Sequence, residues 1–310
     1  MSNILIIKHG SLGDLIQANG AIKDIKNFYK NRKVFLLTSE PYSIFMSECP
    51  YIDGVIIDKR LPRWNLFYLS NLKNKLLRYD ISKVFDLQNS NRTKFYKRFI
   101  IKNVEWSSTE TVLEKGQKKS DFDKDPVLDR MKIQLNKSGI ETDFTKNIDL
   151  SWAIENISRL VKQYANNEYI LLFPFCSLKL KNKKWPYFKE LIQTLKHEFK
   201  NKYAILIAPG PNEIKEAIKL NGKVVLDDNK PIDIKKLVSL INGAKFVIAN
   251  DTGPAHIASH LDKNGLVLFG SHTSAKKVSI ENFNFKAITV QNLKELDVNT
   301  VMQEVNAKLN

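Results

Sequence analysis

Four consecutive residues in the last third of the chain could bind an anion: Asp251, Thr252, Gly253 and Pro254. They follow an apolar run at 246–249 and open a helical pattern, so they predict a turn between a strand and a helix. Proline is favoured in the first helical turn, where unpaired N–H groups and a partial positive charge suit a phosphate. A helix cap without a ligand would use the same residue types, so both interpretations stay open.

A second turn of this kind opens the chain. Residues 4–7 form an apolar run, Gly10 and Gly13 follow, and apolar residues then recur at helical spacing up to residue 28. Open α/β sheets bind ligands at the carboxyl ends of their strands, where this turn would lie. A nicotinamide site is disfavoured, because the G-x-G-x-x-G fingerprint is missing even though Glu40 follows the second predicted strand.

Strands and helices alternate along both halves of the sequence, which is typical of an α/β fold with parallel sheets. Strands are predicted near residues 4–8, 33–38, 54–58, 83–86, 104–106, 169–174, 203–208, 223–226, 245–249, 265–269 and 286–290. Helices are predicted near residues 14–28, 41–47, 64–78, 93–100, 126–138, 185–199, 213–220, 234–241, 254–261 and 296–309. The polar stretch 109–124 predicts a mobile surface loop, and 147–155 predicts a linker.

Composition limits the class of protein. The chain has 310 residues, of which 43% are hydrophobic, enough for two ordinary cores. Its two cysteines, Cys49 and Cys176, lie far apart and favour a reducing compartment over a disulfide framework. No apolar run approaches the ~20 residues of a membrane span, and no signal-peptide pattern is present. We therefore expect a cytoplasmic protein of two domains.

The net charge of +16 predicts attraction to polyanions, although most lysines are scattered as on an ordinary solvated surface. The exception is a group of lysines in one loop: Lys179, Lys181, Lys183 and Lys184. No nucleic-acid-binding signature accompanies the charge, so no nucleic acid is expected as a partner. Asp121, Asp123 and Asp125 follow no predicted strand and are interpreted as solvated loop charges rather than metal ligands.

Three segments, at residues 5–22, 183–192 and 250–261, resemble glycosyltransferase family 9, which includes the bacterial heptosyltransferases of lipopolysaccharide-core synthesis. The resemblance spans nearly the whole chain. It implies the GT-B architecture, in which two Rossmann-like βαβ domains face a central cleft. Residues 1–150 would form the acceptor-side domain and 151–293 the nucleotide-sugar domain, with the C-terminal helix at 294–310 packing back on the first domain.

The resemblance implies that Asp14 is the catalytic base, because it ends a Leu-Gly-Asp motif. A carboxylate beside an attacking sugar hydroxyl contributes about 10²–10⁴-fold to the rate of such a reaction. An acid three residues after Ser11, in the first turn of a helix, is also typical of a capping box. Both roles of Asp14 stay open on the sequence.

Lys183 matches the family's phosphate-contacting lysine before a Trp-Pro helix start, and Lys184 could exchange roles with it. The residues that the resemblance implies for substrate and nucleotide binding are Ser11, Gly13, Ser177, Lys184, Glu213, Asp251, Thr252, Gly253, Pro254 and His256. Glu213 is the candidate for the ribose, with Glu216 as its alternative. Phe175 departs from the small residues that line the family's phosphate pocket, and residues 271–275 lack its Pro-Thr-Asp-Pro pattern, so the donor could differ from ADP-heptose.

We expect an inverting, metal-independent glycosyltransferase that moves a sugar, such as heptose from ADP-heptose, to a lipopolysaccharide-core-type acceptor. His256 and His260 share a helical face but lack a third ligand, so no metal is expected, and the nucleotide sugar is a substrate rather than a cofactor. The acceptor would be a saccharide or lipid-linked, with peripheral contact at the cytosolic face of the inner membrane. The alternatives are a non-catalytic nucleotide- or saccharide-binding paralogue and another GT-B enzyme, such as a sugar-nucleotide epimerase.

Overall fold

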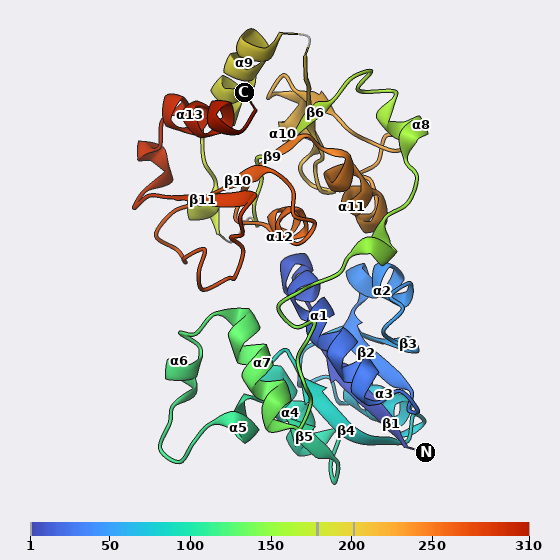
Figure 1. Cartoon of the computed structure of the whole chain (residues 1–310). Helices are drawn as coiled ribbons and strands as arrows, with labels where there is room; N and C mark the ends of the chain where they lie inside the picture. The colour runs from blue at the N-terminus through green and yellow to red at the C-terminus, as the bar shows by residue number, and fades with distance from the viewer. Residues whose placement is uncertain (1, 178–179, 201, 310) are drawn as a thin grey trace. The chain divides into compact units, whose positions relative to one another are not determined.

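The computed structural model describes residues 2–177, 180–200 and 202–309 (Figure 1). The chain divides into two compact units, Met1–Trp152 and Ala153–Asn310. Each unit is a parallel β-sheet covered by helices, as the alternating sequence pattern predicts. Within the described residues, none of the helices combines the length and the hydropathy that a bilayer span requires.

The first unit contains a five-stranded sheet in the order β3-β2-β1-β4-β5. Its strands are β1 (Asn3–Ile7), β2 (Val34–Ser39), β3 (Gly54–Asp58), β4 (Ile81–Asp86) and β5 (Glu105–Ser107). Every neighbouring pair is parallel, so the loops that follow the strands leave the sheet at the same edge. This edge carries the glycine turn after β1.

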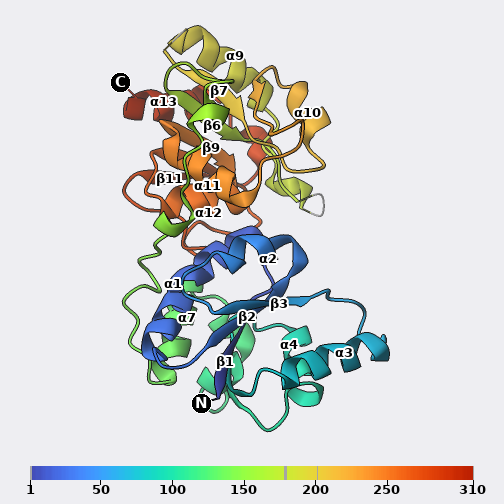
Figure 2. The same ribbon diagram turned by 90° about the vertical axis from the view of Figure 1, so that its right-hand side faces the viewer.

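The helices of the first unit are α1 (Leu12–Phe28), α2 (Glu40–Ser47), α3 (Leu66–Leu77), α4 (Asn91–Phe99), α5 (Thr109–Val112), α6 (Lys119–Phe122) and α7 (Val127–Lys137). Helices α3 and α4 share a core with the sheet, and Figure 2 shows them beside each other at its margin. The α3 side chains Leu69, Leu72 and Leu76 recur at helical spacing and are buried in this core.

The prediction that residues 109–124 form a loop without secondary structure is wrong. The segment contains two short helices, α5 and α6, whose Val112 and Phe122 are buried at 8% and 3% exposure. Two apolar anchors within a polar stretch are enough to attach it to the unit, because each removes a large apolar surface from water.

The second unit contains a six-stranded parallel sheet in the order β11-β10-β9-β6-β7-β8. Its strands are β6 (Tyr169–Phe173), β7 (Ala204–Ile207), β8 (Lys223–Val224), β9 (Phe246–Asn250), β10 (Gly265–Phe269) and β11 (Phe285–Thr289). Its helices are α8 (Ser158–Val161), α9 (Phe188–Phe199), α10 (Ile214–Ile218), α11 (Ile234–Gly243), α12 (Gly253–His260) and α13 (Val298–Leu309). Strands β6, β9 and β10 are buried throughout, as expected for central strands covered on both faces.

The C-terminal helix lies in the second unit, and the expectation that residues 294–310 pack back on the first domain stays a prediction. Helix α13 contacts α9, and Figure 1 shows the two side by side. Val301, Met302 and Val305 belong to the same core as the α9 residues Leu191 and Leu195. The apolar stripe of α13 is therefore satisfied within its own unit.

Helix α1 is held against the segment that follows α7. The buried carboxylate of Asp24 accepts hydrogen bonds from Phe144 N (3.0 Å), Thr145 N (2.8 Å) and Thr145 Oγ1 (2.7 Å). One turn earlier lies Gly20, where an added Cβ would stand 2.0 Å from the Phe144 carbonyl oxygen. The absence of a side chain at position 20 therefore permits this close approach.

We expect Gly20→Ala to destabilise the protein, although the same change normally stabilises a helix interior by about 1 kcal/mol. The methyl group would push α1 away from Phe144, and overpacking of this kind costs about 1–3 kcal/mol. Urea denaturation of the whole chain measures the change in the free energy of unfolding. Asn27→Ala, at an exposed position of α1, is the control and should be neutral or slightly stabilising. Equal stabilisation by both substitutions would contradict the close packing of Gly20.

Candidate active site

The turn after β1 brings Ser11, Gly13 and Asp14 to the carboxyl edge of the first sheet. Asp14 Oδ2 accepts hydrogen bonds from the backbone nitrogen and the hydroxyl of Ser11, both at 2.9 Å. The capping box of α1 is therefore formed. Asp14 Oδ1 lies 3.5 Å from the Nζ of Lys8, and the carboxylate keeps 41% of its surface exposed. Asp14 thus closes the cap and still presents an accessible carboxylate.

Gly10 gives this turn its shape. Its φ of 99° lies in the left-handed region, and an added Cβ would stand 2.4 Å from the ring of Tyr42. The turn is also attached to the loop after β4, because His9 N donates to Gln88 Oε1 (2.9 Å) and Lys8 Nζ donates to the Leu87 carbonyl (3.1 Å). The position of Asp14 is therefore determined by contacts on both sides.

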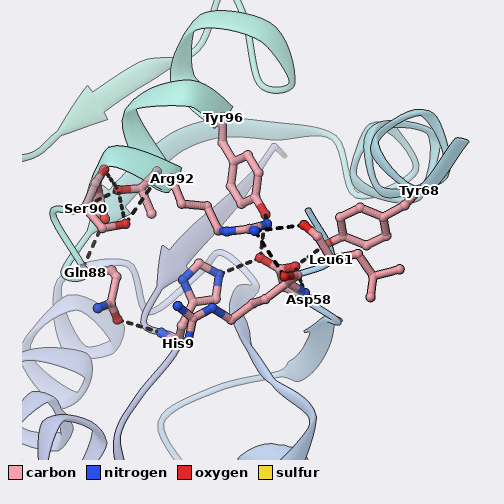
Figure 3. A network of polar contacts seen from close by, with 11 residues as sticks. His9, Asp58, Leu61, Tyr68, Gln88, Ser90, Arg92 and Tyr96 are labelled. Atoms are coloured by element: carbon pink, nitrogen blue, oxygen red, sulfur yellow. Dashed lines mark hydrogen bonds and ion pairs between the residues drawn. The ribbon is translucent and has the colours of Figure 1, made fainter. Parts of the chain in front are cut away.

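A buried polar network lies beside this turn, and sequence reasoning missed it (Figure 3). His9 Nε2 lies 2.7 Å from Asp58 Oδ2 at the end of β3, and both side chains are almost fully buried. Tyr96 OH donates to the same oxygen (2.7 Å), and Tyr68 OH donates to the other. Burial acts to raise the pKa of Asp58, but the His9 and Tyr68 contacts outweigh it and hold the pKa well below its usual range.

In the second unit, the end of β9 is tied to its surroundings by Asn250. Its Oδ1 accepts from Trp185 N (3.1 Å), and its Nδ2 donates to the Pro174 carbonyl (2.9 Å). Strands β9, β6 and β7 are neighbours, so the loops that follow them leave the sheet together. A buried amide with both ends satisfied thus positions the loop after β6 beside the turn after β9.

Asp251 is the centre of the second unit's polar cluster. Its carboxylate is 4% exposed and accepts at Oδ2 from Lys183 Nζ (2.6 Å). His272 Nε2 lies 3.0 Å from the same oxygen, and His256 Nε2 lies 4.0 Å from Oδ1. Burial alone would raise the pKa of Asp251, but Lys183, His256 and His272 together hold the pKa of this carboxyl below its usual range. The cluster therefore stabilises an ionised carboxylate next to a half-buried ammonium.

Thr252, Gly253 and Pro254 form the N-terminal end of α12. Thr252 is the N-cap in an extended conformation, and proline stands in the first turn. All three residues are half-buried, and Thr252 Oγ1 donates to the Asn250 carbonyl (3.3 Å). Pro254 has no N–H, and Ala255 N donates to the Thr252 carbonyl (3.1 Å), so the amides that this helix end can offer to an anion are those of Thr252 and Gly253.

His256 and His260 lie further along α12. Burial lowers the pKa of His260 to about 3, with a smaller contribution from His256. Across residues 2–177, 180–200 and 202–309, no group of three or more His, Cys, Asp or Glu side chains could hold a metal ion.

Cys176 follows β6 and lies near several charged residues that the sequence predicts for the site. Burial raises the pKa of its thiol, and the charges of Lys184, Lys183, Glu213 and Asp251 all act on it. The loops after β6, β7 and β9 therefore bring these four charged side chains to one locality.

The two acidic candidates for binding the ribose, Glu213 and Glu216, make different contacts. Glu213 accepts from Gly210 N (2.7 Å) and so closes its own turn, and burial raises the pKa of its carboxyl. Glu216 is paired with Lys184. Ser177 is exposed, whereas Lys179 and the side chain of Lys181 lie outside the described residues.

Phe175, which replaces the small residues of the family's phosphate pocket, lies in the core of the second unit. Its side chain is 7% exposed and belongs to the core of the second unit, with the Lys184 ammonium 5.4 Å from its ring. It therefore packs into the core rather than filling the polar locality around Cys176.

His272 is a member of the cluster that sequence reasoning did not assign. Its ring stacks on Phe269 with an interplanar angle of 16°, and burial lowers its pKa despite the contact with Asp251. The sequence contained one signal that pointed to His272, because this residue lies within the segment 271–275, which departs from the family pattern. A buried imidazole there contacts the same carboxylate oxygen as Lys183.

The chain is similar to known proteins over most of its length. Residues 71–305 match the model of glycosyltransferase family 9 (heptosyltransferase). The chain is 24% identical to lipopolysaccharide heptosyltransferase 1 of Campylobacter coli, over 99% of this chain and 97% of the relative.

Two solved structures share the fold. The E. coli heptosyltransferase WaaC with ADP superposes with a TM-score of 0.74 at 17% identity, over 99% of both chains. The E. coli ADP-heptose lps heptosyltransferase II gives a TM-score of 0.74 at 17% identity, over 99% of this chain and 98% of the other. The two parallel sheets with alternating helices thus form a GT-B-like α/β fold. Because the family model covers well over half of the sequence, the chain belongs to glycosyltransferase family 9 and is a glycosyltransferase.

Proposed function

We propose that the protein transfers a sugar, heptose from ADP-heptose in the first instance, to a lipopolysaccharide-core-type acceptor that is a saccharide or lipid-linked. The observation that carries the proposal is the Lys183–Asp251 pair at the N-terminal end of α12, which combines an ammonium, a carboxylate and helix amides. Relatives that are heptosyltransferases, one of them solved with ADP, support this choice of donor.

The donor diphosphate would lie at the N-terminal end of α12. Its leaving oxygens gain charge as the sugar departs, and fixed donors and cations stabilise that charge. Thr252 and Gly253 would supply backbone amides, with the Thr252 hydroxyl beside them, and Lys183 would supply the cation. When Lys183 turns to the phosphate, His272 keeps a contact with the Asp251 carboxylate, 3.0 Å away. The positive groups of the chain itself would then replace a metal ion.

The chemical step would be a single displacement with inversion. An acceptor hydroxyl attacks the anomeric carbon, the bond from that carbon to the diphosphate oxygen breaks, and the hydroxyl proton passes to Asp14. The exposed carboxylate of Asp14 is suited to this task, and its contacts with Ser11 and Lys8 limit its movement. Peripheral contact with the cytosolic face of the inner membrane would give access to a lipid-linked acceptor.

We expect Asp14→Asn to lower kcat by about 10²–10⁴-fold, because the amide cannot accept the proton. The amide oxygen can still accept from Ser11, so the helix cap and the donor affinity should be kept. A transfer assay with ADP-, UDP- and GDP-sugars, with product analysis, measures the effect, and Asp121→Asn on α6 is the control. Unchanged kcat in Asp14→Asn would leave Asp14 with the capping role alone. Isomerised donor without transfer would indicate an epimerase.

We expect Lys183→Gln to raise the Kd for ADP by about tenfold to a hundredfold, because a charge-assisted contact with phosphate is lost. Isothermal titration of the folded variant measures the Kd, with circular dichroism as a check on folding. Lys189→Gln, exposed on α9, is the matched control and should bind ADP as the native chain does. An unchanged Kd in Lys183→Gln would contradict the role of Lys183 in donor binding.

We expect ADP to slow the alkylation of Cys176 several-fold, because the thiol lies within the electrostatic reach of Lys183 and Asp251. Cys49 is an internal control, since burial raises its pKa to about 11 and leaves it 2% exposed. Mass spectrometry of peptides from the native protein resolves the two sites. Equal labelling of Cys176 with and without saturating ADP would place the nucleotide elsewhere. Protection by ADP without any transfer would indicate a non-catalytic paralogue.

A further inference from the structure

Helix α3 and the loop before it expose three large apolar side chains. Trp64, Leu66 and Phe67 have 80%, 75% and 79% of their surface exposed, and we call them the Trp64 patch. The opposite stripe of α3 is buried in the core of the first unit. The helix thus satisfies its core with one face and presents a second apolar face to the surroundings. Contiguous exposure of this kind marks an interaction surface.

The charge around the Trp64 patch has a single sign. Residues 59–79 contain six basic side chains and no acidic one. The basic residues are Lys59, Arg60, Arg63, Lys73, Lys75 and Arg78, and all six are exposed. Large apolar side chains within a segment of excess positive charge are complementary to a surface that is both apolar and anionic.

The loop that carries Trp64 is held in place by the buried network of Figure 3. Asp58 Oδ1 accepts from Arg60 N (2.7 Å), while Arg92 Nη2 donates to the carbonyls of Arg60 (3.0 Å) and Leu61 (2.8 Å). At the other end of the loop, Asn65 caps α3 by accepting from Tyr68 N (2.9 Å). The exposure of Trp64 therefore belongs to a fixed loop, and little order has to be created when a partner binds.

The surface continues onto α4. The Arg63 guanidinium lies 5.7 Å from the ring of Phe95, and the tilted ring of Phe99 lies 4.8 Å from Phe95 between centroids. Phe99 is 45% exposed and carries Arg98 5.2 Å from its ring. Aromatic and basic side chains are thus in contact with one another from the loop before α3 to the end of α4.

We propose that the Trp64 patch docks on a bilayer that contains anionic lipids. Tryptophan, leucine and phenylalanine would enter the boundary between headgroups and acyl chains, while the six basic residues contact lipid phosphates. A second copy of the chain fits less well, since a symmetric contact would bring two positive fields together. This proposal says where the membrane contact of the proposed function would take place. The exposed side chains and charges on which it is based do not depend on sugar transfer.

The test is flotation of the full chain with vesicles of phosphatidylethanolamine and phosphatidylglycerol, against vesicles of phosphatidylcholine alone. We expect binding to the anionic vesicles only, weakened by salt. The triple variant Trp64→Ser, Leu66→Ser, Phe67→Ser should bind at least about tenfold more weakly, since three apolar insertions are lost. Phe283→Ser, which removes a side chain 86% exposed in the second unit, is the matched control and should bind as the native chain does.

Tryptophan fluorescence locates the contact. Of the four tryptophans, Trp106 and Trp185 are buried and Trp152 is half-buried against Phe45, so Trp64 is the most exposed. Anionic vesicles with brominated acyl chains should therefore quench Trp64, and Trp64→Phe should remove most of this quenching while binding persists. Equal binding of the triple variant and the native chain, equal binding to neutral vesicles, or no binding at all would overturn the proposal. The proposal would also be overturned if the native chain formed an oligomer that the triple substitution dissociates. The vesicles contain neither donor nor acceptor, and ADP titration of the triple variant shows separately whether donor binding persists.

Discussion

Each sheet carries a buried carboxylate at the carboxyl end of a strand, and such a charge is stable only when its partners are in place. In the first unit Asp58 is held by His9 and the tyrosines of α3 and α4. In the second unit Asp251 is held by Lys183 and His272. The loops that supply these partners are thereby fixed near the strand ends, where parallel α/β sheets bind ligands. Both candidate regions, the turn that carries Asp14 and the cluster around Asp251, lie beside such a carboxylate.

The Asp58 network serves two neighbouring structures at once. Through His9 it contacts the turn that carries Asp14, and through Arg60 N it holds the loop that carries Trp64. Arg92 strengthens the second connection by donating to two carbonyls of that loop. A carboxylate that no motif marks therefore supports both the candidate base and the exposed aromatic surface. Such a residue acts through its neighbours rather than on a substrate.

Much of the fold could be predicted because the central strands are continuous apolar runs. Residues 54–58 and 265–269 were predicted as strands with the bounds that β3 and β10 have, since turn residues limit both runs. Prediction was wrong where few apolar residues decide the structure, since the polar segment 109–124 contains α5 and α6, held by Val112 and Phe122. The C-terminal segment was predicted as a helix, and its apolar stripe lies in the core that contains α9. Amphipathic spacing indicates that a helix forms, but not which core receives it.

The alternation of strands and helices, the family and the turns that carry Asp14 and Asp251 can be derived from the amino-acid sequence, because they depend on local spacing and on short motifs. The three-dimensional fold was needed to show that Asp58 contacts His9, that His272 shares Asp251 with Lys183, and that Phe175 is a core residue. Those contacts join residues far apart in the chain. Strand order and register set them, and local sequence does not encode which strands become neighbours.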